Sequence, residues 1–146
     1  MKTLAEDTHV KIVQRVTRGD ELCESSRSRD AIAEYEKALE RLPQPFSDWD
    51  AAAHILAAVG DAHYLAGEYG EAETALVAAM HCPGAIGNPF LHLRLGQCAF
   101  KKGNRRRAAD ELTRAYMGGG KEIFDGEEPE YFVFIKTILK EPPGGW

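Results

Sequence analysis

The stretch GDAHYLAGEYGEAETALVAA, residues 60–79, decides the fold because its glycines and small apolar residues recur elsewhere in the chain. Five positions return 36 residues later, and the matched pairs are Gly60 and Gly96, Gly67 and Gly103, Ala72 and Ala108, Leu76 and Leu112, and Ala79 and Ala115. Part of the same pattern lies 41 residues earlier, as Gly19-Asp20, Ala31 and Ala38, with Tyr35 in the place of Leu76. Such self-similarity predicts a protein built from stacked repeats.

Each repeat is predicted to form two helices around a short turn. In the middle repeat we expect helices over residues 49–66 and 71–81, because apolar residues return there every three or four positions. Small residues such as Gly60 and Ala72 allow the paired helices to cross closely. Pro83-Gly84 cannot continue a helix and ends this repeat. The repeats are therefore predicted over residues 8–43, 49–84 and 89–120.

The order of large, small and apolar residues in these units resembles the tetratricopeptide repeat (TPR) family. In the middle repeat the family's positions are filled by Leu56, Gly60, His63 or Tyr64, Ala72, Leu76, Ala79 and Pro83. In the third repeat they are filled by Leu95, Gly96, Phe100, Ala108, Leu112 and Ala115, with glycines 118–120 in place of the proline. The first repeat keeps Gly19, Ala31, Tyr35, Ala38 and Pro43, but its turn, residues 25–29, departs from the pattern.

This resemblance implies an all-α fold, a right-handed superhelical α-solenoid of three helix-turn-helix repeats with a C-terminal capping helix. We predict a single domain over residues 1–146, with the capping helix over 128–140 and a flexible tail over 141–146. A stacked array exposes an apolar face at its end, and a cap closes that face. The pattern is similar to that of small stand-alone bacterial TPR proteins.

The predicted capping helix has one apolar stripe. Phe132, Ile135 and Leu139 fall at helical spacing and could cover Leu112 and Tyr116 of the third repeat. Trp146 at the end of the tail has two interpretations. It either folds back on the cap, which we favour, or serves as an anchor for a partner.

Composition and charge are those of an ordinary globular domain. The 146 residues are 44% hydrophobic and 28% charged, which disfavours wholesale disorder and a disulfide scaffold. The N-terminus becomes acidic where a signal peptide needs an apolar run, and no apolar stretch is long enough to span a bilayer. The three cysteines, Cys23, Cys82 and Cys98, include no close pair. Free thiols and a cytoplasmic location are therefore expected.

The sequence offers no catalytic or metal-binding pattern. The five histidines are scattered, and neither CxxC nor HExxH occurs. Gly118-Gly119-Gly120-Lys121 differs from a phosphate-binding loop, because Glu122 stands where that loop needs Ser or Thr. No nucleophile lies beside an obvious base. We therefore expect a protein that is not an enzyme and holds neither a metal nor a cofactor.

The resemblance implies that the first helices of the repeats line a concave groove. The groove residues carried over by position are Val16, Asp20 and Glu24 from the first repeat, His54, Ala57, Asp61, Tyr64 and Leu65 from the second, and Phe90, Leu93, Arg94, Gln97, Phe100 and Lys101 from the third. Family members that clamp a peptide carboxylate use asparagines where Asp20, Asp61 and Gln97 stand here. An acidic half-groove with aromatic residues suits a basic or mixed-charge protein segment. The expected anchors are Tyr64, Phe90, Arg94 and Phe100.

Charge is unevenly distributed along the chain. Residues 1–90 carry a net charge of −7, residues 91–121 carry +6, and residues 122–146 carry −4. A basic patch is predicted at the turn of the third repeat, from Lys102, Arg105, Arg106 and Arg107. It could grip an acidic protein or a phosphate backbone. The alternative, which we favour slightly, is a solvated turn partly neutralised by the acidic residues 125–128.

The predicted function is a protein–protein interaction module that binds a partner protein through its groove. A bacterial immunity protein or chaperone that occupies the surface of a toxin or secreted effector is one form of this hypothesis. The alternatives are a self-assembling structural repeat and a nucleic-acid-associated module that uses the basic third repeat. Nucleic acid is the less favoured partner because no aromatic residues alternate with the basic ones. We expect no membrane partner, and either a monomer or a weak homodimer.

Overall fold

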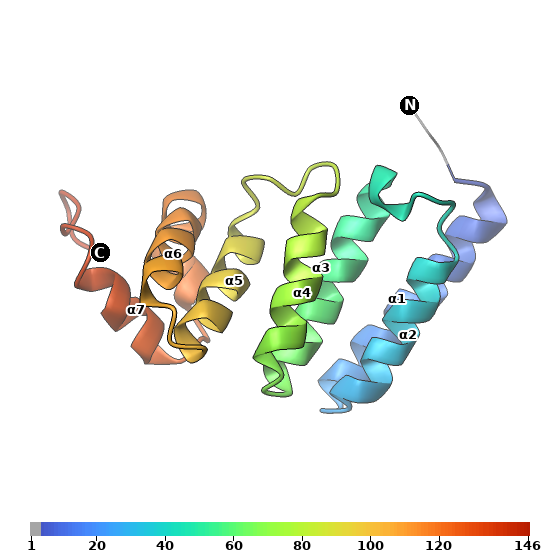
Figure 1. Ribbon diagram of the computed structural model, residues 1–146, viewed down its shortest axis with the longest axis horizontal. Helices are drawn as coiled ribbons and strands as arrows, with labels where there is room; N and C mark the ends of the chain where they lie inside the picture. The colour runs from blue at the N-terminus through green and yellow to red at the C-terminus, as the bar shows by residue number, and fades with distance from the viewer. Residues whose placement is uncertain (1–3) are drawn as a thin grey trace. The chain divides into compact units, whose positions relative to one another are not determined.

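The computed structural model describes residues 4–146, and all regular structure within them is helical. Residues 1–3 of the predicted domain lie outside the described residues. The α-helices are α1 (Glu6–Glu24), α2 (Ser28–Glu40), α3 (Asp50–Leu65), α4 (Tyr69–Met80), α5 (Pro89–Lys101), α6 (Arg105–Gly119) and α7 (Pro129–Lys136) (Figure 1). Two short 3-10 helices, η1 (Phe46–Asp48) and η2 (Lys121–Phe124), lie in the connections. The prediction of an all-α fold is confirmed for the described residues.

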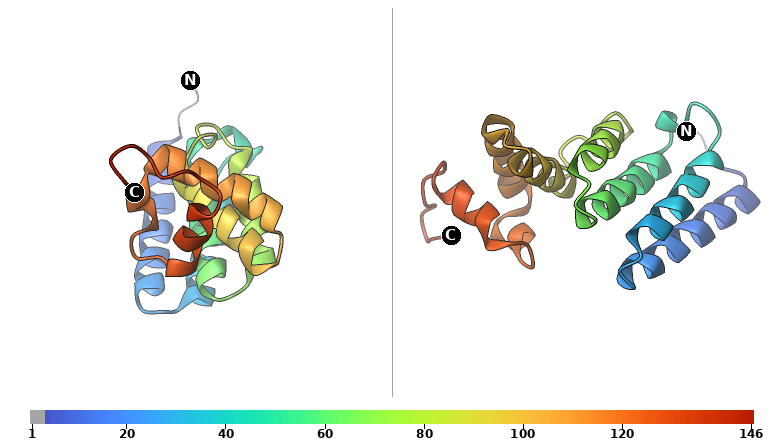
Figure 2. Two further views of the ribbon diagram at one scale, coloured as in Figure 1. Left: turned by 90° about the vertical axis from the view of Figure 1, so that its left-hand side faces the viewer. Right: turned by 60° about the horizontal axis from the view of Figure 1, so that its bottom comes forward.

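The chain divides into two compact units, of which the first ends at Ile86 and the second runs from Gly87 to Trp146. The boundary falls in the segment between the second and third predicted repeats. The first unit contains α1 to α4, where α1 packs against α2, α2 against α3 and α3 against α4. These helices lie side by side in Figure 1 and in the right-hand view of Figure 2. The second unit contains α5, α6, η2 and α7.

Glycines allow the two helices of a repeat to approach closely. A Cβ atom on Gly60 of α3 would lie 2.6 Å from Cγ of Leu76 on α4. In the second unit, a Cβ atom on Gly96 of α5 would lie 2.6 Å from Cγ of Leu112 on α6. Carbon atoms in contact are normally about 3.5–4.0 Å apart, so a larger residue at either glycine would push the helices apart. The repeated glycines are therefore helix-crossing positions.

Helix α5 is buried along most of its length. Its start is fixed by Asn88, whose side chain accepts a hydrogen bond from the N–H of Phe90, and by Pro89 in the first turn. Every residue from Leu91 to Ala99 is buried. Because this run includes polar residues, these residues need hydrogen-bond partners inside the protein.

Helix α7 packs on the third repeat as a cap. Tyr131 and Ile135 are fully buried, and the ring of Phe132 lies 6.5 Å from that of Tyr116 on α6. The sequence stripe identified Ile135 and Phe132 but missed Tyr131. The helix ends at Lys136, before the predicted residue 140, and the chain continues in a turn.

The tail returns to the cap. The ring of Trp146 lies 5.9 Å from that of Tyr116 and 5.8 Å from that of Phe132. Trp146 therefore folds back on the cap, as the favoured interpretation of the sequence predicted. None of the helices within residues 4–146 combines the length and apolar content needed to cross a lipid bilayer.

Candidate functional site

The candidate residues of the first unit lie on α1 and α3, the first helices of the first two repeats. Asp20 of α1 accepts a hydrogen bond of 2.6 Å from the hydroxyl of Tyr35 on α2. Tyr35 is buried, and its burial together with this bond raises the pKa of the hydroxyl far above its usual range. The hydroxyl therefore stays protonated and acts as a fixed donor, which holds the exposed Asp20 carboxylate in place.

The thiol of Cys23, close to Asp20 on α1, lies near carboxylates from both helices. Burial raises the pKa of this thiol, while a contact of 3.7 Å with the Tyr35 hydroxyl lowers it. The negative charges of Asp61 on α3 and of Asp20 raise it further. Carboxylates from α1 and α3, the first helices of successive repeats, therefore both act electrostatically on the Cys23 thiol. The raised pKa also makes Cys23 a weak nucleophile at neutral pH.

An acidic face can therefore be defined in the first unit by Asp20, Glu24 and Asp61. Asp20 and Glu24 are four residues apart on α1 and share one side of that helix. Glu24 and His54 are exposed, and Asp61 is half-buried. Carboxylates in this arrangement favour a cationic side chain of a partner.

The apolar part of this face comes from the end of α3. Tyr64, predicted as an anchor, is only 8% exposed, and its ring packs 5.6 Å from the ring of Tyr69 on α4. The next residue, Leu65, is 59% exposed. Only a small part of the Tyr64 side chain is therefore accessible to a partner, whereas more than half of Leu65 is accessible. Sequence position placed both residues in the groove but could not rank their exposure.

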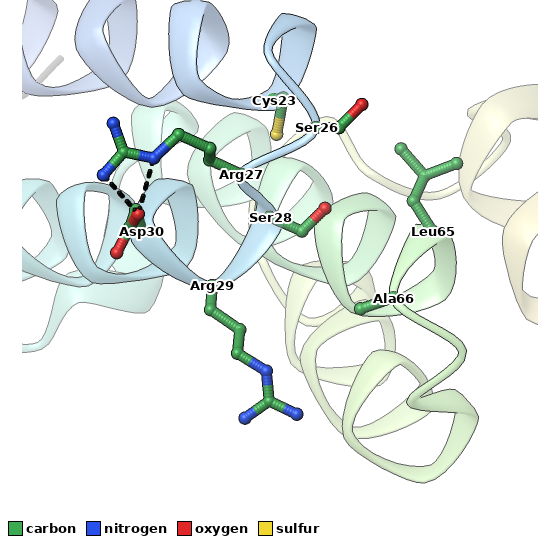
Figure 3. Close-up of a pocket in the computed structure, with 8 residues that line it drawn as sticks. All are labelled: Cys23, Ser26, Arg27, Ser28, Arg29, Asp30, Leu65 and Ala66. Atoms are coloured by element: carbon green, nitrogen blue, oxygen red, sulfur yellow. Dashed lines mark hydrogen bonds and ion pairs between the residues drawn. The ribbon is translucent and has the colours of Figure 1, made fainter.

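A hollow of about 590 Å³ lies beside Leu65 and Cys23 (Figure 3). Its lining residues come from the turn between α1 and α2 and from the end of α3, and they are Cys23, Ser26, Arg27, Ser28, Arg29, Asp30, Leu65 and Ala66. Figure 3 shows Arg27 turned toward Asp30, with which it makes an ion pair of 2.6 Å. Arg29 is paired with Glu68 at 3.1 Å. The hollow is therefore open, and its arginines are already paired with carboxylates of the protein.

The candidate residues of the second unit contact the chain's own C-terminal segment. Arg94 and Gln97 of α5 both donate hydrogen bonds to one carboxylate oxygen of Glu127, and Arg94 also donates to the side-chain oxygen of Gln97. Lys101 lies 2.8 Å from a carboxylate oxygen of Glu130. We call residues 125–130, which carry these carboxylates, the acidic strap. From the sequence, residues 125–128 were expected to neutralise part of the basic turn, but their pairing with Arg94 and Gln97 was not predicted, because these residues lie about thirty positions from the strap.

The two phenylalanines predicted as anchors are also engaged within the second unit. The ring of Phe100 lies 5.4 Å from that of Tyr131 and 5.3 Å from that of Phe134, both on α7. The guanidinium of Arg94 lies over the ring of Phe90 at 5.0 Å. Phe100 therefore contributes to docking the cap, a role that a groove position does not reveal.

The basic patch is less available than its sequence suggests. The guanidinium of Arg105 lies over the ring of Phe100 at 4.0 Å, which is a cation–π contact. Lys102 and Arg106 are exposed, and Arg107 is half-buried. Lys101, which precedes the patch, is within 3.5 Å of Glu128 of the acidic strap. The alternative of a turn partly neutralised by residues 125–128 agrees with this ion pair.

Potential metal ligands and cysteines were also candidates for chemistry in the described part of the chain. Within residues 4–146, no three His, Cys, Asp or Glu side chains are grouped so that they could hold a metal ion. Cys23, Cys82 and Cys98 are free thiols, and burial raises the pKa of Cys82.

The fold has counterparts among solved structures. No protein-family model and no curated protein sequence matches the chain. Solved structures do match. The Yersinia enterocolitica type III secretion chaperone SycD, in complex with a peptide of the translocator YopD, aligns with a TM-score of 0.70 and 15% identity, over 93% of this chain and 95% of that one. The chain has a TPR-like fold.

Two further structures support this conclusion. The second TPR of Spaghetti (RPAP3), bound to the HSP90 peptide SRMEEVD, aligns with a TM-score of 0.65 and 16% identity, over 78% of this chain and 99% of that one. PcrH, in complex with the chaperone binding region of PopB, aligns with a TM-score of 0.64 and 15% identity, over 92% and 94%. The resemblance to the TPR family that the repeats predicted is therefore confirmed at the level of the fold.

Proposed function

We propose that this TPR-like chain is a non-enzymatic module that binds a basic or mixed-charge segment of a partner protein through the acidic face of its first unit. The observation that carries the proposal is that Asp20, Glu24 and Asp61 lie on the corresponding helices α1 and α3, which also supply the exposed Leu65 and part of the lining of the hollow. A partner segment with a cationic side chain next to a large apolar one would match this surface in charge and in shape.

The acidic face is favoured over the second unit for a physical reason. The corresponding α5 residues, Arg94, Gln97 and Lys101, already bind carboxylates of the acidic strap. In the first unit, by contrast, Glu24 and Leu65 are exposed. A segment that binds there can reach Glu24 and Leu65 without first displacing the acidic strap.

Within this class we propose a chaperone or immunity role toward a secreted effector or toxin. Its support is analogy of fold: SycD and PcrH are solved in complexes with segments of YopD and PopB, and a Spaghetti TPR is solved with an HSP90 peptide. The cytoplasm is the location that fits this role and the free thiols. We propose neither self-assembly nor nucleic-acid binding, because the carboxylates of the acidic face favour a cationic segment of a partner protein.

The test uses defined peptides, so it does not require the partner to be known. Fluorescein-labelled twelve-residue peptides that combine Leu with Lys or Arg, and matched peptides with Glu in place of the cations, are titrated with the protein and followed by fluorescence anisotropy. We expect the cationic peptides to bind more tightly, and expect that affinity to fall as salt is added. Tighter binding of the acidic set would contradict the proposal.

The matching variants locate the site. Asp20→Asn with Asp61→Asn should weaken binding of the cationic peptides about tenfold, since each exposed ion pair contributes about 0.2–1 kcal/mol. Glu36→Gln with Glu40→Gln changes the net charge equally on exposed positions of α2 and is the control. Equal loss in both double variants would mean that total charge, and not the acidic face, attracts the peptide.

A further inference from the structure

The acidic strap lies on a polar stripe of α5 that is built to receive carboxylates. The stripe consists of Arg94, Gln97 and Lys101, which are three and four residues apart and so share one face of the helix. All three residues donate hydrogen bonds to carboxylates of the strap. We call this row of donors the carboxylate-binding stripe.

The deep end of the stripe holds Glu127. One oxygen of its carboxylate receives a hydrogen bond of 2.8 Å from Nε2 of Gln97 and another from Nη1 of Arg94. Gln97 is 0% exposed and Arg94 is 7% exposed. A buried guanidinium without an anion is strongly disfavoured, so this end of the stripe requires a carboxylate from some source.

The shallow end of the stripe holds the other two glutamates of the strap. Nζ of Lys101 lies 2.8 Å from Oε1 of Glu130 and 3.5 Å from Oε2 of Glu128. The hydrogen bond from Lys101 lowers the pKa of the Glu130 carboxyl. Both glutamates are exposed, so added salt or a competing carboxylate can reach these contacts.

The strap runs into the first turn of α7, but it and the rest of the cap are held by different forces. The cap is anchored by the fully buried Tyr131 and Ile135 and by ring contacts with Phe100. The strap is held mainly by charge, because its side chains other than Glu127 are exposed. A competing acidic segment can therefore displace the strap while the apolar contacts of the cap persist.

We propose that the acidic strap is a built-in ligand of the carboxylate-binding stripe, which closes the stripe to acidic segments of other proteins until the strap is displaced. This inference goes beyond the proposed function, which concerns basic segments and the first unit. It predicts a second binding site in the same chain, which the strap occupies. This site would bind a segment with two or three glutamates close together. The two proposals can fail independently because they involve different residues and probes of opposite charge.

The experiment weakens the contacts of the strap in the full chain by substitution. A peptide with the sequence of the strap is then used as the probe. The variant carries Glu127→Gln, Glu128→Gln and Glu130→Gln, and the probe is a fluorescein-labelled peptide FDGEEPEY, the sequence of residues 124–131. We expect the variant to bind this peptide at least about tenfold more tightly than the wild type, and to lose that gain when Lys101→Ala is added. The peptide FDGQQPQY should not bind.

The matched control carries Glu36→Gln, Glu40→Gln and Glu71→Gln, which alter the net charge equally at exposed positions outside the second unit. If the strap variant keeps its helical circular dichroism but binds FDGEEPEY no better than this control, the strap is only a structural tie and the proposal is wrong. Should the strap variant lose its helical signal, hydrogen exchange on the wild type decides the question. Millimolar FDGEEPEY should speed amide exchange in residues 125–130, and unchanged exchange would overturn the proposal.

Discussion

Replacing Gly60 by alanine tests whether the repeated glycines set the distance between paired helices. A Cβ atom at this position would lie 2.6 Å from both Cγ and Cδ2 of Leu76. Normal contact requires about 3.5–4.0 Å, so roughly 1 Å of movement is needed. Leu76 is fully buried, and Cγ is not the free end of its side chain. The strain therefore has to be relieved by moving α3 away from α4.

Two opposing effects determine the size of the change. Overpacking a filled core costs about 1–3 kcal/mol, whereas Gly→Ala inside a helix gains about 1 kcal/mol in helix propensity. We expect Gly60→Ala to lower the free energy of unfolding by about 1 kcal/mol. Gly70 is the matched control, because it lies in α4 of the same unit and a Cβ there would meet nothing within 4 Å. Gly70→Ala should stabilise the unit by about 0.5–1 kcal/mol.

The assay is urea unfolding of both variants, followed by circular dichroism at 222 nm. The two variants should differ by about 1.5–2 kcal/mol, which corresponds to midpoints about 0.8–1 M apart for a slope near 2 kcal/mol per molar urea. The reasoning is refuted if Gly60→Ala is as stable as Gly70→Ala, since the crossing would then have room for a methyl group.

Two further predictions concern stability. The hydrogen bond from Arg15 lowers the pKa of the Glu34 carboxyl, so this contact stabilises the fold above the unfolded pKa of about 4.3 and is lost as pH falls through the lower folded value. Glu34→Gln should therefore reduce the free energy of unfolding at pH 7 by up to about 1 kcal/mol and have a smaller effect at pH 3. Urea midpoints measured at both pH values would check this, and an equal loss at both would contradict it. Trp146→Ala removes ring contacts with Tyr116 and Phe132 and should destabilise the second unit by about 1 kcal/mol, whereas Trp146→Phe should retain part of that stability. Thermal unfolding of the two variants tests this. Identical melting temperatures of Trp146→Ala and the wild type would show that the tail does not stabilise the second unit.

The helix pairs could be predicted from the sequence because their determinants are local and periodic. Gly60 and Leu76 belong to one repeat, and the same pair recurs as Gly96 and Leu112, so a single pattern reports both the helices and the residues at their crossing. The end of the capping helix was predicted less accurately. Helix α7 ends at Lys136, and an apolar stripe does not mark where a helix ends.

The candidate site was only partly predictable. The position of Asp20 and Asp61 in their repeats placed them on corresponding helices, and the structure brings both near Cys23. The availability of Tyr64 and Arg94 could not be deduced, since each depends on what a different element places over it. Tyr64 is covered by Tyr69, and Arg94 is paired with a glutamate 33 residues away.

The sequence alone determined the repeats, the helix pairs and the uneven charge, because each is a property of short spacing or of composition. Only the tertiary structure decided where that charge is neutralised. The basic α5 and the acidic strap are separate runs in the sequence, yet they meet as Arg94, Gln97 and Lys101 against Glu127 and Glu130. Burial makes such pairing necessary, since a guanidinium removed from water must have an anion beside it. The acidic face of the first unit is therefore the surface that we propose for binding a partner.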